Sequence, residues 1–469
     1  MHPLMFSSYL NVISVFLTLW KRAESAAGFK TYIQKKTNHT GAPRSGVPPT
    51  FIQTYATNDQ FAKRSTSPPI LLLYVGNEDP LPLETVKSPS PFNDDMIELA
   101  KDLGAYVAAV EHRFYGQSFP TRTNPSDTLK TLLTTEQAVE DVAQIRDWIL
   151  KSLSLPVDST KVVLFGSSYG GALAGWTRQA HPDKFEAAVA NCPVFDFPVT
   201  APGYYDAVYS FFGDQRLGGS KECRDKIKEA HAKVGELLRN PGSRRQLERE
   251  FSLKPKSLED RWNRIFWIRD GLLEFDDARN DPYCTGRYCN IKGICAKFTK
   301  RERSTPYERL VQIFKATSGA GPHDIDFAAR SKRFSDPKNL DDVKMWNFQK
   351  CSELGIIPAC KSDNCMWPPQ VPGNDAILFK YGCDLAYGID TAELTAHNRR
   401  LNVKWGGRSL HGATKILSVV GEIDPWKQYG VLRGASKLPL LLDIGRSCQK
   451  GQACQVLVWS FVVDQDSVT

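Results

Sequence analysis

The sequence Gly166-Ser167-Ser168-Tyr169-Gly170 constrains the fold of this chain more than any other feature. It follows a short apolar run, Val162 to Phe165, and precedes a stretch with helical character, Ala172 to Ala180. Gly-x-Ser-x-Gly between a buried strand and a helix is typical of a sharp turn that lifts a serine hydroxyl clear of a sheet. Residues two before and two after the serine crowd the backbone of this turn, so only small residues fit there.

The spacing of this motif selects Ser168 as the candidate nucleophile and leaves Ser167 as its rival. The turn also points the backbone N–H of Tyr169 at a developing oxyanion, and a second donor comes from the loop after an earlier strand. That loop begins at Gly76, and a backbone N–H near Asn77 is the candidate. Two simpler interpretations remain open, namely that the motif is a Gly-rich turn and that Asn77 lies in an ordinary polar loop.

Strands and helices alternate along the first half of the chain. We predict buried strands at Pro69 to Val75, Tyr106 to Val110 and Phe185 to Ala190. A helix is predicted from Asn93 to Leu103, and Thr134 with Gln137 forms a candidate capping box for the next helix. Strands that alternate with amphipathic helices indicate a parallel sheet, and hence the α/β class.

The acid that would accompany Ser168 is expected just after a late strand. Strand character returns at Thr414 to Val420, and Asp424 follows it, so Asp424 is the first candidate and Glu422 the second. The acid would orient an imidazole and stabilise its charged form. An aspartate in a turn before proline is the alternative, because this pattern is common.

The histidine base of such a triad is missing from its expected place. The chain has eight histidines, and none follows Asp424. His411 precedes Asp424 across the same strand and is expected at the opposite end of it, whereas His112 is expected to be a structural or pocket residue. Without a base, a serine hydroxyl is a weak nucleophile at neutral pH.

Composition excludes several classes of partner. The net charge is +8, and the densest basic run, Lys297 to Arg303, is better explained as a solvated helix face than as a nucleic-acid site. Eleven cysteines indicate an oxidising compartment, and their spacing favours disulfides over zinc. The sequence therefore predicts no nucleic-acid partner, no metal and no organic cofactor.

The N-terminal region predicts secretion. Val12 to Trp20 is an apolar run too short to cross a bilayer, and small residues follow it, so residues 1–25 are a predicted signal peptide. No other segment is long and apolar enough to span a membrane. Asn38-His39-Thr40 is a glycosylation sequon, which predicts a glycan on Asn38.

Several further stretches resemble one family of serine exopeptidases, that of lysosomal Pro-X carboxypeptidase, dipeptidyl peptidase II and thymus-specific serine protease. The matching stretches are Tyr74 to Glu78, Glu111 to Gly116, Leu133 to Ala138, Gly166 to Gly171, Trp346 to Glu353 and Gly421 to Trp426. The resemblance implies an α/β-hydrolase core with an inserted helical cap, Ser168 as nucleophile and Asp424 as acid. It also implies a peptide substrate with proline near one end and a secreted or lysosomal protein. A homodimer is a further expectation.

On this basis we expect a core at residues 48–200 and 341–438, a helical cap at 201–340 and an atypical tail at 439–469. The chain departs from the family at Ser167, where a glycine is usual, and in lacking an Asp-His-Phe signature before Phe51. It also lacks the Gly-x-His loop expected after the acid. Three functions remain open: an active exopeptidase, an inactive relative or faulty gene model without the base, and an esterase-like hydrolase.

Overall fold

The computed structural model describes residues 28–42, 45–89, 94–271, 285–318, 321–360, 364–366, 374–421, 423–431 and 457–462. The predicted signal peptide, Glu422 and the predicted tail apart from 457–462 lie outside these residues. In the part of the chain that the structure describes, no helix combines the length and apolar character needed to cross a membrane.

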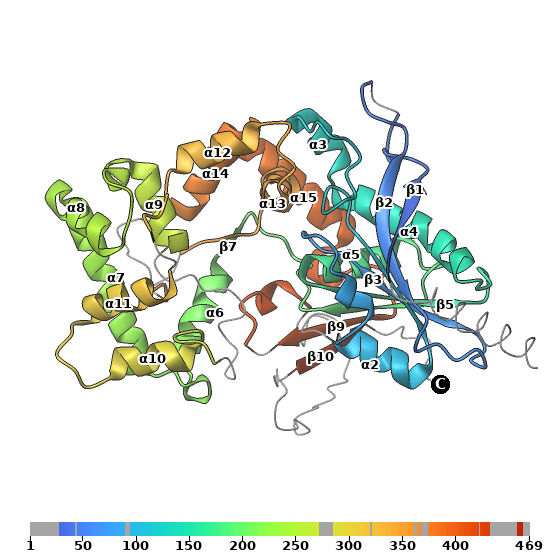
Figure 1. Cartoon of the computed structure of the whole chain (residues 1–469), viewed down its shortest axis with the longest axis horizontal. Coiled ribbons are helices and arrows are strands. Elements are labelled where there is room, and N and C mark those ends of the chain that lie inside the picture. Colours follow the sequence, from blue (N-terminus) through green and yellow to red (C-terminus); the bar gives the residue numbers. More distant parts are fainter. Residues whose placement is uncertain are drawn as a thin grey trace, which may run out of the picture.

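A mixed sheet forms one half of the molecule (Figure 1), with the strand order β1-β2-β4-β3-β5-β6-β9-β10. The strands are β1 (Gly28–Gln34), β2 (Phe51–Asn58), β3 (Ile70–Val75), β4 (Tyr106–Val110), β5 (Lys161–Ser167), β6 (Ala187–Asn191), β9 (Ile416–Gly421) and β10 (Leu457–Val462). Strands β4, β3, β5, β6 and β9 are parallel, while β1, β2 and β10 pair antiparallel to their neighbours. This arrangement is the α/β-hydrolase core that the resemblance predicts.

The central strands are buried on both faces. Along β3, Leu71 and Leu73 belong to one hydrophobic cluster, and Leu72 and Tyr74 belong to another. The first cluster includes helices α4 (Thr135–Ser152), α5 (Ser168–Ala180) and α15 (Thr391–Trp405), and the second includes α2 (Asp94–Leu103). Because every residue of such a strand faces a helix layer, its sequence is a continuous apolar run.

Helices dominate the other half of the molecule (Figure 1). They are α6 (Pro202–Gly213), α7 (Lys221–Arg239), α8 (Pro241–Glu250), α9 (Arg261–Gly271), α10 (Ile291–Thr299), α11 (Pro306–Thr317), α12 (Phe327–Ser335), α13 (Asp342–Gln349) and α14 (Asn374–Tyr387). Most of α6 to α11 packs around one hydrophobic cluster, and a disulfide joins Cys223 of α7 to Cys295 of α10. We propose that α6 to α12 form the cap, which the sequence predicts at residues 201–340.

A third hydrophobic cluster joins the two halves. It combines Phe114 and Tyr115, which follow β4, and residues of α3 (Ser126–Leu132) with Phe348 of α13 and Tyr387 of α14. A disulfide between Cys351 and Cys383 lies in the same cluster. The helices after residue 340 therefore pack on the core as well as on the cap.

The predicted ends of individual helices and strands are confirmed in some places and wrong in others. The strand at Tyr106–Val110 is confirmed, and α2 ends at Leu103 before Gly104, whose φ is +65°. The capping box at Thr134 is only half formed: Thr134 accepts from the Gln137 backbone N–H at 3.3 Å, but the Gln137 side chain does not return to Thr134. It donates instead to Asn38 Oδ1 at 2.6 Å, because tertiary packing offers a partner from the N-terminal segment.

Candidate active site

Ser168 lies at the turn between β5 and α5, as the motif predicts. Its φ is +53°, in the left-handed region that a residue with a Cβ rarely adopts. Ser168 is partly exposed, whereas Ser167 is fully buried and has the ordinary extended backbone of a helix N-cap. The backbone therefore places the Ser168 side chain at the surface of the turn. The Ser167 side chain is buried by the surrounding residues.

The glycines of the motif are fixed by close backbone contacts. A Cβ on Gly166 would overlap the carbonyl oxygen of Gly170, and a Cβ on Gly170 would lie 2.8 Å from the carbonyl oxygen of Val75. The sequence-based explanation for small residues at these two positions is thus borne out by the distances.

We expect Gly166→Ala to lower the free energy of unfolding by about 2–3 kcal/mol, because the added methyl group meets main-chain atoms that cannot rotate away. Chemical denaturation followed by tryptophan fluorescence measures the change. Gly293→Ala is the matched control, since its Cβ approaches a side-chain oxygen of Asn290 at 3.3 Å within helix α10. Equal midpoints for the two variants would contradict the steric explanation.

The N-terminus of α5 is capped from another loop. Ser167 makes no side-chain cap, but Asn77 Oδ1 accepts from the Gly170 N–H at 2.6 Å. Asn77 follows β3, so this bond holds the β3 loop against the serine turn. The N–H of Tyr169, in the first turn of α5, has no acceptor within its own helix. The structure adds a side-chain role for Asn77 to the predicted backbone one, which stays a prediction.

Asp424 follows β9, and its Oδ1 accepts from the Trp426 N–H at 2.8 Å. Strands β5, β6 and β9 are parallel neighbours, so their carboxyl ends meet at one edge of the sheet. This edge carries both Ser168 and Asp424. The second candidate acid, Glu422, lies outside the described residues.

A chain of buried hydrogen bonds lies behind the serine turn. His112 Nδ1 donates to the Arg113 carbonyl at 2.6 Å, and its Nε2 accepts from the Tyr169 hydroxyl at 3.2 Å. Tyr169 in turn accepts from Gln349 Nε2 at 2.9 Å. Burial lowers the pKa of His112 to about 4, so the imidazole stays neutral and its tautomer is fixed by these bonds. His112 is thus a buried structural residue.

The other described histidines also make their hydrogen bonds away from the serine turn. His39 bonds to Asp141, His181 to Glu140, and His397 to the Ser352 carbonyl. His231 is buried in α7, and His411 is exposed near Ser409. His323 packs its ring 5.4 Å from that of Phe314. The absence of a histidine base remains a prediction from the sequence.

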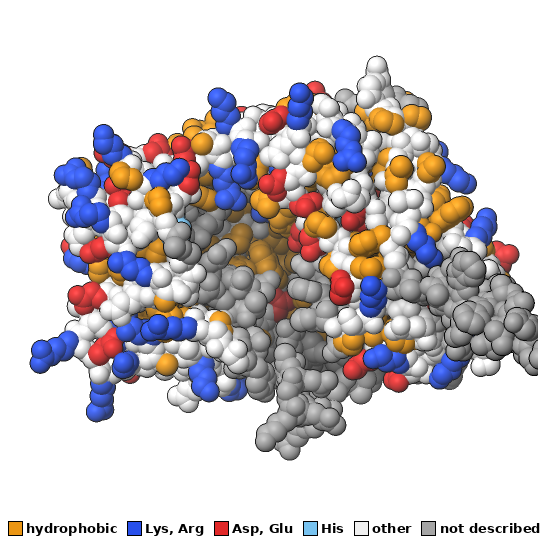
Figure 2. All heavy atoms as spheres, viewed as in Figure 1, with side chains coloured by type: hydrophobic (Ala, Val, Ile, Leu, Met, Phe, Trp, Pro, Cys, Tyr) orange, Lys and Arg blue, Asp and Glu red, His pale blue; other side chains and the backbone are white. Residues whose placement is uncertain are grey.

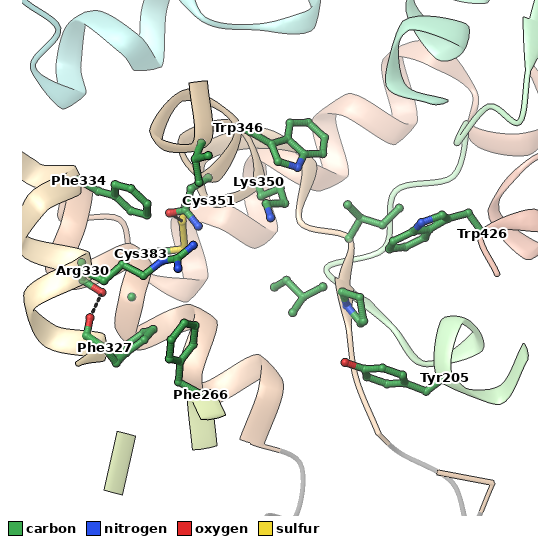
Figure 3. A pocket seen from close by; sticks show the side chains of 17 residues that line it. Tyr205, Phe266, Phe327, Arg330, Phe334, Trp346, Lys350, Cys351, Cys383 and Trp426 are labelled. Carbon is green, nitrogen blue, oxygen red and sulfur yellow. Dashed lines mark hydrogen bonds between the residues drawn. A yellow bond between two sulfur atoms is a disulfide. The ribbon is translucent and has the colours of Figure 1, made fainter. Parts of the chain in front are cut away.

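A pocket of about 350 Å³ lies between the cap and the core. Figure 2 shows a hollow between the two halves with hydrophobic side chains in its depth. The pocket residues are Tyr205, Phe266, Phe327, Arg330, Ser331, Phe334, Val343, Trp346, Asn347, Lys350, Cys351, Ile356, Ile357, Pro358, Gly382, Cys383 and Trp426 (Figure 3). Trp426 is two residues from Asp424, and the Trp346 ring packs 5.6 Å from that of Tyr169, beside Ser168. The pocket is thus lined by one residue of the Asp424 loop and by one aromatic ring that contacts Tyr169, while Ser168 and Asp424 are not among its described lining residues.

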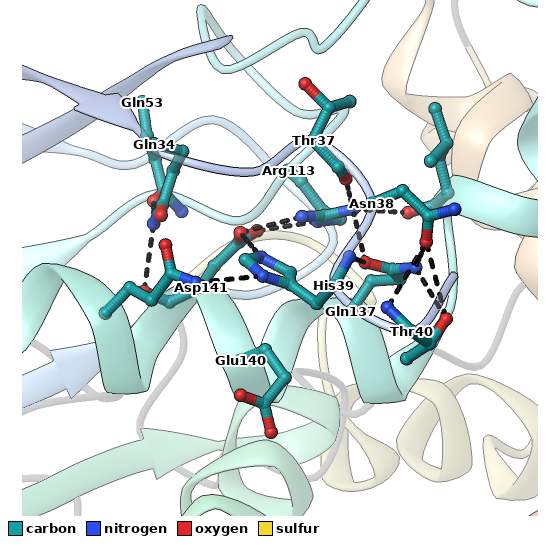
Figure 4. Close-up of polar contacts among 12 residues, drawn as sticks. Gln34, Thr37, Asn38, His39, Thr40, Gln53, Arg113, Gln137, Glu140 and Asp141 are labelled. Atoms are coloured by element: carbon teal, nitrogen blue, oxygen red, sulfur yellow. Dashed lines mark hydrogen bonds and ion pairs between the residues drawn. The ribbon is translucent and has the colours of Figure 1, made fainter. Parts of the chain in front are cut away.

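A buried ion pair anchors the core next to β4 (Figure 4). Arg113 donates to Asp141 through Nε at 2.6 Å and Nη2 at 2.7 Å, and both side chains are fully buried. His39 Nε2 donates to Asp141 Oδ1 at 2.7 Å. Burial alone raises the pKa of Asp141, but the Arg113 charge and the hydrogen bonds outweigh it, so the pKa lies below its usual value.

Glu353 carries a carboxylate whose environment disfavours charge. It accepts from the Thr135 N–H at 3.0 Å and from the Thr135 hydroxyl at 2.9 Å. The residue keeps some exposure, yet its carboxylate is desolvated, and this burial raises the pKa of Glu353 to about 7 despite the two bonds. The group therefore takes up a proton in the folded state at a higher pH than in the unfolded chain.

Because its folded pKa is raised, Glu353 favours folding fully below about pH 4.5, and that contribution is lost as pH rises through about 7. We expect Glu353→Gln to unfold like the wild type at pH 4.5 and to be more stable by about 2 kcal/mol at pH 8. Denaturant midpoints at the two pH values test this. Surface Glu393, paired with Lys130 at 2.7 Å, is the control position; its Gln variant should show no such pH-dependent gain.

Disulfides explain most of the described cysteines. Besides the two already named, Cys360 pairs with Cys365, and Cys289 is disulfide-bonded. Cysteines that are close in sequence do not all pair with one another, since Cys295 pairs with Cys223 and Cys351 with Cys383. Among the residues that the structure describes, no group of three or more His, Cys, Asp or Glu side chains is arranged to bind a metal ion.

The residues that line the pocket were not among the site residues predicted from the sequence. Trp346 and Lys350 lie in the Trp346 to Glu353 stretch that carried the family resemblance, so a signal was present. Arg330 lies on a helix among other basic residues and had no distinguishing pattern. The lining residues come from α6, α9, α12, α13, α14, the segment after α13 and the loop after β9, which lie far apart in the sequence.

The model of the serine carboxypeptidase S28 family matches residues 46–450. Thymus-specific serine protease of Mus musculus is 29% identical over 414 residues, which cover 85% of this chain and 78% of that protein. The human protein of that name is 28% identical over 415 residues, covering 85% and 77%. Lysosomal Pro-X carboxypeptidase of Bos taurus is 23% identical over 432 residues, covering 88% and 80%.

Solved structures match smaller parts of the chain. An acylaminoacyl peptidase in complex with Z-Gly-Gly-Phe-chloromethyl ketone covers 39% of this chain and 25% of its own, with 14% identity and a TM-score of 0.24. A likeness of that size carries no argument, so the fold assignment rests on the strand order and the serine turn. The family match spans most of the sequence, and the chain belongs to the serine carboxypeptidase S28 family.

Proposed function

We propose that this chain is a serine-type exopeptidase that hydrolyses peptide bonds next to proline. Ser168 is the nucleophile, Asp424 is the acid of the triad, and the N–H groups of Tyr169 and of a residue near Asn77 stabilise the oxyanion. The observation that carries the proposal is the φ of +53° at Ser168 in a strand-turn-helix. Strained backbone of this kind concentrates at functional sites.

Proline preference is supported by the pocket and by the relatives. The pocket between the helical half and the core has aromatic walls that include Trp346 and Trp426, and flat apolar rings suit the ring of a proline. One relative is named lysosomal Pro-X carboxypeptidase. That name and the disulfides also support the proposal of a secreted or lysosomal protein. The Asn38 glycan, the signal peptide and the homodimer remain predictions.

A second candidate function is a peptide-binding protein without hydrolysis. It is favoured by one observation, the lack of any histidine after Asp424 in a sequence whose described histidines bond elsewhere. In acyl transfer an imidazole held by the acid takes the proton of the serine. The two functions therefore share the pocket and differ in that one proton transfer.

The test uses the full chain with its disulfides formed. A fluorophosphonate probe reports an activated serine, and a panel of proline-containing peptides with either end blocked is compared with simple acyl esters. We expect labelling together with peptide hydrolysis. Binding of peptides without labelling supports the second function, and turnover of esters alone would replace both with an esterase.

A further inference from the structure

A glutamine from α13 reaches the residue that follows the candidate nucleophile. Gln349 is fully buried, and its Nε2 donates to the Tyr169 hydroxyl at 2.9 Å. Tyr169 comes directly after Ser168, and its backbone N–H is the predicted oxyanion donor. We propose that Gln349 is a positioning residue, which holds the Tyr169 side chain and thereby keeps the Tyr169 N–H directed at the oxyanion. This role rests on the proposed function and adds to it a residue 180 positions from Tyr169 in the sequence.

The direction of each hydrogen bond around Gln349 follows from one end of the buried chain. The Arg113 carbonyl oxygen can only accept, so the His112 Nδ1 that lies 2.6 Å from it carries the proton. The pKa of His112 is lowered to about 4, so the ring is neutral and its Nε2 accepts from the Tyr169 hydroxyl at 3.2 Å. That hydroxyl oxygen then accepts from Gln349 Nε2, and Gln349 Oε1 accepts from the Tyr115 hydroxyl at 2.5 Å. The Tyr169 hydroxyl thus has one acceptor and one donor, and rotation of its side chain would break both bonds.

The ring of Tyr169 is also held by two neighbouring rings. The centre of the Trp346 ring lies 5.6 Å from that of Tyr169, and the centre of the His112 ring lies at the same distance. Trp346 and Gln349 are three residues apart on α13, so one face of this helix supplies both a ring contact and a hydrogen bond. The Tyr169 side chain is therefore fixed by α13 and by the segment after β4.

The serine turn needs such support because its backbone is strained. Ser168 has a φ of +53°, and a residue with a Cβ stays in this region only where the surrounding contacts hold it there. The loop after β3 supplies one contact, since Asn77 Oδ1 accepts from the Gly170 N–H at 2.6 Å. Gln349 supplies another through Tyr169. An oxyanion donor stabilises the transition state only within hydrogen-bond reach, so releasing Tyr169 should slow acyl transfer more than it weakens substrate binding.

The experiment compares Gln349→Met, Tyr169→Phe and the double variant in the full chain with its disulfides formed. Each single change removes the hydrogen bond between the two side chains. We expect each to lower the rate constant of fluorophosphonate labelling by about 10- to 100-fold, since the loss of a whole oxyanion donor costs about 10²–10³. The double variant should label no more slowly than the slower single variant, because both changes act through one bond. With a proline-containing peptide, kcat should fall by the same factor while KM stays within about twofold.

Gln349→Glu is a second variant of similar shape. At pH 8 an ionised carboxylate has no proton to donate to the Tyr169 hydroxyl, so this variant should also label more slowly than the wild type. It keeps the test available if Gln349→Met does not fold.

Tyr387→Phe is the matched control. The Tyr387 hydroxyl donates to the Lys344 carbonyl of α13 at 3.0 Å, so this change also removes a buried hydrogen bond to the helix that carries Gln349. It should lower the denaturant midpoint as Gln349→Met does, but leave the labelling rate unchanged. A wild-type labelling rate in the Gln349 variants, an equal loss in Tyr387→Phe, or losses that multiply in the double variant would each overturn the role of Gln349 alone. Absence of labelling in the wild-type chain would instead overturn the proposed function, and this role with it.

Discussion

Replacing Ser168 by alanine is expected to abolish covalent labelling of the chain by a fluorophosphonate. The probe needs a nucleophilic oxygen, and Ser168 is the serine that the turn presents toward solvent, with φ at +53°. If the triad is complete, the same change lowers kcat by a factor on the order of 10⁶. Intact-protein mass spectrometry measures the labelled fraction directly.

The neighbouring serine provides the control. Ser167→Ala alters the same turn by the same atom, but the Ser167 side chain is fully buried at the end of β5. Labelling should persist in this variant and map to Ser168 in the peptide digest. A label that survives Ser168→Ala, or that maps to Ser167, would reassign the nucleophile.

Asp141→Asn is expected to lower the free energy of unfolding by about 3–5 kcal/mol. The amide keeps the size of the carboxylate but removes the charge that faces Arg113, whose side chain is fully buried. It also turns N–H groups toward donors of Arg113 or His39. Losing one partner of a buried pair is costly because the remaining charge has no counterion. Denaturant unfolding at neutral pH gives the value.

Glu140→Gln is the matched control for Asp141→Asn. The two residues are adjacent on α4, and Glu140 bonds to His181 at 2.9 Å with its side chain 35% exposed. Pairs exposed to water contribute about 0–1 kcal/mol, so the control should change little. Asp141→Asn should also cost much less when Arg113→Met is already present. If the two changes in the free energy of unfolding simply add in the double variant, the unpaired Arg113 charge is not the cause of the destabilisation.

Local patterns in the sequence predicted the parts of the fold that burial alone determines. The run before Val75 is continuously apolar because β3 faces a helix layer on each side, and Tyr106–Val110 forms β4 as predicted. The serine turn was predictable because Gly166 is constrained by Gly170 within the same turn, although Gly170 itself is constrained by Val75 from a distant strand. The position of Asp424 directly after the last parallel strand was also predictable, and its role as the acid stays a prediction.

Contacts between distant segments were beyond such patterns. The bond of His39 to Asp141 joins residues 102 apart, and the disulfide of Cys223 with Cys295 joins residues 72 apart. Gln137 has the position of a capping residue, yet it bonds to Asn38 because the fold brings that side chain within 2.6 Å. These partners are determined by the topology of the fold. The local hydrophobic periodicity of the sequence does not predict which distant segments meet.

The wall of the pocket is built from several segments of the chain, and this affects how proteins of this family can diverge. Arg330 and Phe327 come from α12, whereas the strained serine belongs to β5 and α5, more than one hundred residues earlier in the chain. Substitutions on one face of α12 can therefore change the wall of the pocket while the serine turn keeps its glycines. The pocket wall and the serine turn are encoded by separate segments of the chain. Mutations can therefore accumulate in one of them while the other is unchanged.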